Sequence, residues 1–135
     1  MNKIANAVLG AGLLVSALVP AASATASVGP ARDAHIQLTV ARTQGETEAV
    51  GFIWLDCPGQ SGQAHPRTRE ACADLHTAHG DFTRLPGQDT AICSNDAGPV
   101  TVTAHGIYQG RQVHWEHTFD NDCELALATG PVFDF

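Results

Sequence analysis

The stretch PVTVTAHGIYQGRQVHWEHTF, residues 99–119, decides the fold of this chain. β-Branched and aromatic side chains alternate with polar ones along much of it, which is the period of strands with one buried face. Two dipeptides interrupt the pattern. His105-Gly106 and Gln109-Gly110 are both typical of turns, and the second pair fits either a turn or a bulge. The stretch therefore predicts consecutive antiparallel strands.

Further strands are expected on both sides of this stretch. Residues 35–42, HIQLTVAR, alternate apolar and polar side chains in the same way. Residues 49–57, AVGFIWLDC, carry apolar side chains on both faces, which is typical of a strand covered on both sides. Residues 58–63, PGQSGQ, break that strand as a loop. The final VFDF, residues 132–135, is expected to form a short strand.

A helix is predicted over residues 65–80, HPRTREACADLHTAHG. Pro66 suits the first turn of a helix, and Gly80 provides a stop at the C-terminal end. Cys72 and Leu75 recur at helical spacing, so Cys72 is expected to face inward.

A second, shorter helix is expected near the C-terminus. Asn121 is a suitable N-cap, Glu124 stands three residues later, and Gly130 marks the end. Together these elements predict an α+β domain built on an antiparallel sheet.

The chain has four cysteines, which lie 15, 21 and 30 residues apart. An even count in a small exported chain predicts two disulfides, and the sequence alone permits three pairings. Zinc is the competing interpretation, but these spacings contain no Cys-x-x-Cys pair, so no metal is expected. The four residues are Cys57, Cys72, Cys93 and Cys123.

Residues 1–24 are predicted to be a secretory signal peptide, with cleavage after Ala24 or Ala26. A membrane helix is less suitable, because glycine and serine interrupt the apolar run and no basic flank follows it. Removal of residues 1–24 removes Lys3 and leaves 6 arginines against 14 acidic residues, a formal charge of 6 − 14 = −8. A secreted, extracellular protein is expected, with neither nucleic acid nor membrane as partner.

The histidines and serines of the sequence suggest two other hypotheses, a metal-binding site and hydrolase activity. His76 and His79 lie three residues apart on the predicted helix, but the sequence indicates no third ligand. Ser61 and Ser94 lack a nucleophile elbow or a comparable signature. The sequence therefore predicts no cofactor and no enzymatic activity.

Several motifs in register with the cysteines resemble the Streptomyces subtilisin inhibitor family, over nearly the whole chain after the signal peptide. The matching segments are LTV at 38–40, HP at 65–66, ACADL at 71–75, HGD at 79–81, PVTVTAHGIYQGR at 99–111, NDC at 121–123 and VFDF at 132–135.

The resemblance implies a secreted, usually dimeric inhibitor of subtilisin-like serine proteases, formed by residues 33–135. Its expected fold is a five-stranded antiparallel sheet with two helices packed on it. It also implies disulfides from Cys57 to Cys72 and from Cys93 to Cys123. The alternative is a secreted binding module on the same scaffold whose inhibition is lost or directed at another class, such as a metalloprotease.

The resemblance also places the reactive bond between Asn95 and Asp96, two residues after the third cysteine. Members often carry methionine or lysine at the position of Asn95. Asn121 lies two residues before Cys123 and is expected to support the loop by hydrogen bonds to its backbone. The other expected loop residues are Ile92, Cys93, Ser94, Ala97 and Gly98.

Overall fold

The computed structural model describes residues 33–59, 65–89 and 92–135, and four strands and two α-helices form more than half of these residues. The predicted signal peptide, residues 1–24, lies outside these residues, as do both cleavage positions. The strands are β1 Ala34–Gln44, β2 Thr47–Cys57, β3 Val100–Tyr108 and β4 Arg111–Phe119. The α-helices are α1 Thr68–Thr77 and α2 Asp122–Thr129, and two 3₁₀ helices are η1 Phe82–Arg84 and η2 Gly130–Phe133.

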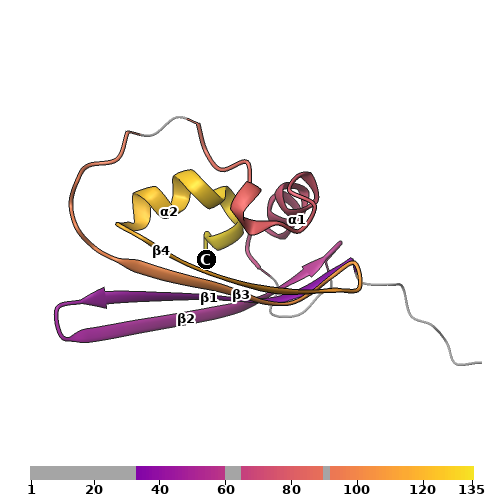
Figure 1. Cartoon of the computed structure of the whole chain (residues 1–135), viewed down its shortest axis with the longest axis horizontal. Helices are drawn as coiled ribbons and strands as arrows, with labels where there is room; N and C mark the ends of the chain where they lie inside the picture. The colour runs from indigo at the N-terminus through magenta and orange to yellow at the C-terminus, as the bar shows by residue number, and fades with distance from the viewer. Residues whose placement is uncertain (1–32, 60–64, 90–91) are drawn as a thin grey trace, which may run out of the picture.

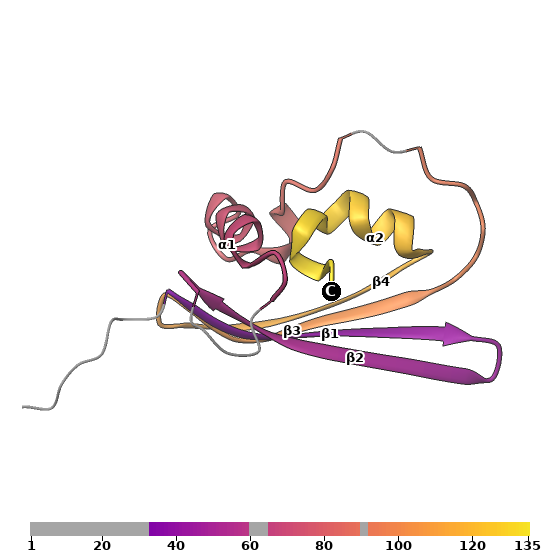
Figure 2. The same cartoon turned by 180° about the vertical axis from the view of Figure 1, so that it is seen from behind.

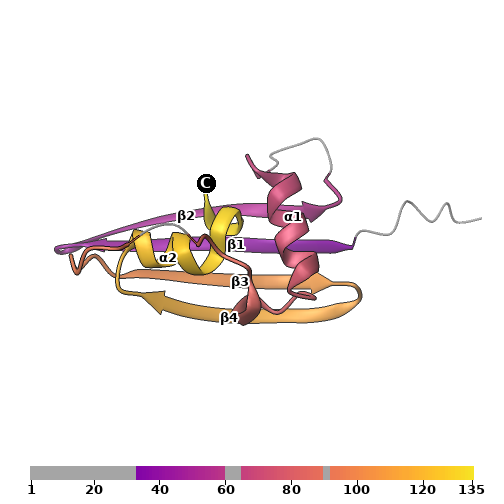
Figure 3. The same cartoon turned by 90° about the horizontal axis from the view of Figure 1, so that it is seen from above.

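The strands form one antiparallel sheet in the order β2-β1-β3-β4. Both helices lie on the same face of the sheet, as Figures 1 and 2 show from opposite sides. Seen from above, α1 crosses the sheet near the β3–β4 turn, and α2 lies toward the other end (Figure 3). The α+β prediction is therefore confirmed.

The core forms because alternate strand residues point toward the helices. On β1 the even-numbered side chains Ile36, Leu38 and Val40 are buried. Leu75 of α1 and Val132 of η2 cover them from above and are also fully buried. The odd-numbered residues of β1 and their neighbours on the other strands point away from the helices, and we call this side the outer face.

The count of five strands implied by the resemblance is wrong for the described residues, which form four. One of the two turns expected from the sequence is also absent. Gln109 and Gly110 form the β3–β4 turn, with φ angles of 46° and 76° that suit a two-residue hairpin loop. His105 and Gly106 instead continue β3 without a break. A Cβ atom on Gly106 would collide with the backbone of His35 on β1, so this glycine allows close approach and makes no turn.

The C-terminal residues also differ from the prediction. Residues 130–133 form η2, although VFDF was expected to be a strand. Pro131 lies in the first turn of η2, where its fixed φ is favourable. An N–H group at this position would have no partner within the helix, so its absence costs no hydrogen bond. Val132 and Phe133 are 0% and 3% exposed. The apolar pattern therefore predicted burial correctly and secondary structure wrongly.

A buried histidine fixes the start of α1. His65 is 2% exposed, and its Nε2 donates a hydrogen bond to the Val132 carbonyl at 2.9 Å. The Arg67 backbone N–H donates to His65 Nδ1 at 3.0 Å, which requires the neutral ring. Burial lowers the pKa of His65 and so favours the same neutral form. Pro66 was expected in the first turn of the helix, but α1 begins at Thr68, so Pro66 lies in the turn that precedes the helix.

The Cys57–Cys72 disulfide joins the end of β2 to α1, with 5.7 Å between the two Cα atoms. Both cysteines belong to the core, so the inward orientation expected for Cys72 is confirmed. The pairing implied by the resemblance is present.

Candidate functional site

The segment 92–99 is an exposed loop that carries the predicted reactive residues. It has no regular secondary structure and enters β3 at Val100. Ile92 is 100% exposed, and the side chains of residues 94–97 are exposed as well. Figures 1 and 2 show this segment arching over the end of the sheet where β3 starts and β4 ends. Residues 94–97 thus lie where another molecule can reach them.

Covalent and backbone contacts hold this loop at both ends. The Cys93–Cys123 disulfide fixes its start to α2, with 5.6 Å between the Cα atoms. Near its other end, the Gly98 N–H donates to the Asp120 carbonyl at 2.9 Å. The four residues between these attachments are Ser94, Asn95, Asp96 and Ala97.

Asn121 makes the expected contacts with the middle of the loop. Its Nδ2 donates to the Ser94 carbonyl at 3.3 Å and to the Asp96 carbonyl at 3.1 Å. Its Oδ1 accepts from the Glu124 N–H at 2.9 Å, which caps α2. One amide group therefore starts the helix and holds the backbone on both sides of Asn95.

A hollow of about 250 Å³ lies between the loop and the start of α2. The carboxylates of Asp96, Asp120 and Glu124 border it. A fourth carboxylate, Asp122, is paired with Arg42 of β1 at 2.8 Å. The loop therefore lies on a surface that is rich in acidic side chains.

A contact inside the loop was missed from the sequence. The Ser94 hydroxyl donates to Asp96 Oδ2 at 2.8 Å, across Asn95. A Ser-x-Asp triplet would have been the only signal, and such triplets are common in ordinary turns. The contact adds a side-chain link to the two backbone bonds from Asn121.

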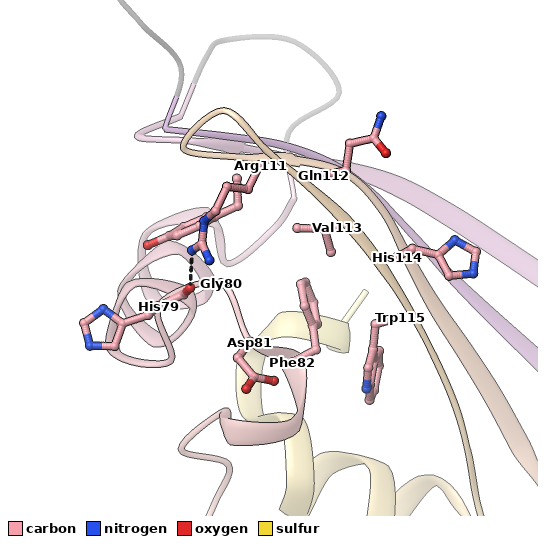
Figure 4. Close-up of a pocket in the computed structure, with 10 residues that line it drawn as sticks. His79, Gly80, Asp81, Phe82, Arg111, Gln112, Val113, His114 and Trp115 are labelled. Atoms are coloured by element: carbon pink, nitrogen blue, oxygen red, sulfur yellow. Dashed lines mark hydrogen bonds between the residues drawn. The ribbon is translucent and has the colours of Figure 1, made fainter.

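A larger hollow of about 320 Å³ lies at the opposite end of β3, between η1 and the β3–β4 turn (Figure 4). Phe82 and Trp115 stack in it with 5.5 Å between ring centroids, and both belong to the packing against the core. Arg111 donates to the His79 carbonyl at 3.0 Å, at the end of α1. These three side chains are engaged in holding α1 and η1 to the sheet.

The described residues contain no group of three or more His, Cys, Asp or Glu side chains placed to hold a metal ion. Within the same ranges, no helix is both long enough and apolar enough to cross a membrane.

The geometry of a tethered exposed loop agrees with comparisons to known proteins. Residues 32–121 match the model of the family described as subtilisin inhibitor-like. The chain belongs to the subtilisin inhibitor-like family. This family consists of protease inhibitors and not of enzymes.

Individual relatives support the same assignment. The chain is 42% identical over 97 residues to protease inhibitor SIL-V5 of Streptomyces luteoverticillatus, covering 68% of this chain and 90% of that protein. It is 35% identical to Kexstatin-1 of Streptomyces platensis over an alignment of 146 residues that spans both chains completely.

A solved structure is similar as well. Streptomyces caespitosus sermetstatin, crystallised in complex with Bacillus licheniformis subtilisin, superposes with a TM-score of 0.60 at 35% identity. The match covers 76% of this chain and 98% of that one.

Proposed function

We propose that the protein inhibits subtilisin-like serine proteases by presenting residues 92–98 as a substrate-like loop, with Asn95–Asp96 as the bond offered. The observation that carries the proposal is the attachment of this loop, by the Cys93 disulfide and by Asn121, in a chain of an inhibitor family. The alternative of a retargeted scaffold has less support, because a similar chain is held in complex with subtilisin.

The physical reason for the tether lies in the ordering of the loop. A protease binds substrate as an extended segment, and a flexible segment loses conformational entropy when it binds. Fixing the loop beforehand removes most of that loss. The exposed, small side chains around Asn95 leave its backbone accessible to the enzyme.

The same attachments oppose hydrolysis. When the protease serine attacks the Asn95 carbonyl carbon, the bond to the Asp96 nitrogen breaks and that nitrogen leaves as an amine. Asn121 holds the carbonyls of Ser94 and Asp96, one on each side of this bond. Because the amine stays beside the acyl-enzyme, it re-forms the peptide bond faster than water completes hydrolysis.

Titration of subtilisin with the purified protein tests this function. We expect activity to fall linearly to a one-to-one ratio of binding sites, and slow cleavage to give a new N-terminus at Asp96. The matched variant is Asn121→Ser, which retains an N-cap oxygen for α2 but loses both donors to the loop. It should be cleaved faster at an unchanged helix content. A protein that leaves subtilisin fully active at excess would contradict the proposal.

Secretion is a further part of the proposed function. It is supported by the signal-peptide pattern of residues 1–24 and by the two disulfides, which persist in oxidising surroundings. The inhibitor domain would then be residues 33–135.

We also propose a homodimer that forms through the outer face of the sheet. This face exposes apolar side chains that a second copy would cover, among them Phe52 at 66% and Trp54 at 38% exposure. Tyr108 does not belong to it, because this side chain is 2% exposed and packs against His76 under α1. Gln37 lies on the outer face as well, paired in register with Trp54.

Sedimentation at micromolar concentration should therefore give the mass of a dimer. Phe52→Glu should shift it to the monomer mass, because dimerisation would bury a charge in an apolar contact. Glu70→Gln is the control and should remain dimeric, because Glu70 is exposed on α1, which covers the opposite face of the sheet. A monomer mass for the parent protein would exclude the dimer.

A further inference from the structure

The hairpin formed by β1 and β2 continues beyond the rest of the sheet at the end that carries the reactive loop. Pairing of β1 with β3 ends at Arg42 opposite Val100, whereas pairing of β1 with β2 continues to Gln44 opposite Thr47. We call residues 43–49 the hairpin tip. All of its side chains are exposed. Figures 1 and 3 both show the tip beside the segment that leads into β3.

Two contacts fix the hairpin relative to the loop. The Thr43 N–H donates to the Pro99 carbonyl at 3.4 Å, immediately after the proposed loop. Arg42 Nε donates to Asp122 Oδ1 at 2.8 Å, and Asp122 directly follows the loop-holding Asn121. The tip and the loop are therefore attached to the same few residues at the start of α2 and β3.

Strand alternation decides which side of the tip faces the loop. Leu55 and Cys57 of β2 are buried under the helices, so Thr47 and Ala49 also point to the helix side. On β1, Gln44 shares that side with the buried even-numbered residues. The reactive loop lies over this side as well (Figure 1). On this side the tip thus offers exposed, uncharged side chains, Gln44, Thr47 and Ala49, next to the loop.

The usual size of protein–protein interfaces indicates that the loop alone is too small to form the whole contact with a protease. Stable complexes bury about 800 Å² on each partner, with about 20–30 residues a side. The loop has only seven residues, from 92 to 98. An enzyme bound at Asn95–Asp96 must therefore also contact residues beside the loop. The hairpin tip lies beside the C-terminal end of the loop.

We propose that the helix side of the hairpin tip, formed by Gln44, Thr47 and Ala49, is a second contact surface for the protease bound at the reactive loop. It contacts the part of the enzyme that holds the residues after the cleaved bond, because the tip is attached at Pro99. The inference rests on the proposed function and adds a determinant of protease choice outside the loop. Since these three side chains are uncharged, the contact depends on shape more than on salt concentration.

Two tryptophan variants on neighbouring residues of β1 test the contact with subtilisin as the probe. Gln44→Trp places a large ring on the helix side, and we expect its inhibition constant to rise about tenfold or more, equivalent to about 1.4 kcal/mol. Thr43→Trp places the same ring on the outer face and should stay within about twofold of the parent. Hydrogen exchange supplies the second measurement. Amide exchange at Gly45 and Glu46, in the turn of the tip, should slow when subtilisin binds.

The outcomes separate this inference from the proposed function. If the parent binds subtilisin and its loop amides 94–98 become protected, the proposed function stands. Unchanged inhibition by Gln44→Trp, together with unprotected amides at Gly45 and Glu46, would then overturn the second contact alone. A parent that neither binds nor inhibits subtilisin would overturn both.

Discussion

Replacing Cys93 and Cys123 together by serine should convert the inhibitor into a slowly cleaved substrate. The disulfide is two residues from the proposed bond and is the covalent link between the loop and α2. Without it, the residues before the bond are held only by the two exposed hydrogen bonds from Asn121, worth about 1 kcal/mol each, while the Gly98 bond to Asp120 remains at the other end. After cleavage the Asp96 amine would then move away before the bond re-forms. Incubation with subtilisin, followed by mass spectrometry, measures the cleavage rate.

The other disulfide provides the matched control. Loss of the Cys93–Cys123 bond, which spans 30 residues, should lower the free energy of unfolding by about 3–4 kcal/mol in the chain-entropy model. Loss of Cys57–Cys72, which spans 15, should lower it by about 3 kcal/mol. The second double variant loses at least as much stability, since its serines also lie in the core, but it keeps the loop attached and should still inhibit. If the Cys93→Ser, Cys123→Ser protein folds and inhibits as well as the parent, the tether argument fails.

Strand β1 and the start of α2 were predictable because the patterns that indicate them are local properties of the chain. Alternation on residues 35–42 predicted the buried side of β1, and the cap formed by Asn121 and Glu124 predicted the start of α2. Each signal depends on neighbours a few residues away. Such signals survive folding whenever the tertiary structure does not oppose them.

The errors occurred where a distant segment decides the conformation. Gly106 has the composition of a turn, but its lack of a Cβ serves the approach of β1, 71 residues earlier in the chain at His35. Phe133 has a strand-like neighbourhood, yet it packs on Phe82 in a 3₁₀ helix. The apolar pattern indicated correctly that Phe133 is buried, whereas the turn-like composition at Gly106 was misleading. Neither pattern reports which element meets these residues.

The candidate site also contains features that could be predicted from the sequence and features that could not. The loop and its partner Asn121 came from a resemblance over several motifs, because a loop of small polar residues has no periodicity to read. The Ser94–Asp96 contact left only a common Ser-x-Asp triplet in the sequence, and the attachment of the hairpin tip at Pro99 left no signal at all. Geometry was needed to connect β1 with the loop.

Asn95→Met should tighten binding to subtilisin by about tenfold or more, since about 1.4 kcal/mol corresponds to a factor of ten. Asn95 is exposed on the loop, so its replacement removes no core contact from the free inhibitor. In an apolar specificity pocket the amide gives up water with few partners, at a cost of about 1–3 kcal/mol. A methionine side chain buried there would instead gain about 1.5–3 kcal/mol. Both contributions favour the variant.

The comparison requires inhibition constants for parent and variant at one pH and one salt concentration. Ala97→Met is a suitable control, because it adds the same side chain to the loop two residues beyond Asn95 and outside the position that enters the specificity pocket. It should change binding far less than Asn95→Met does. Equal or weaker binding by Asn95→Met would mean that the bond offered lies elsewhere in the loop, or that Asn95 fits a polar pocket of a different protease. Mapping the new N-terminus in the slowly cleaved complex separates these two outcomes, because an N-terminus at Asp96 leaves only the polar pocket.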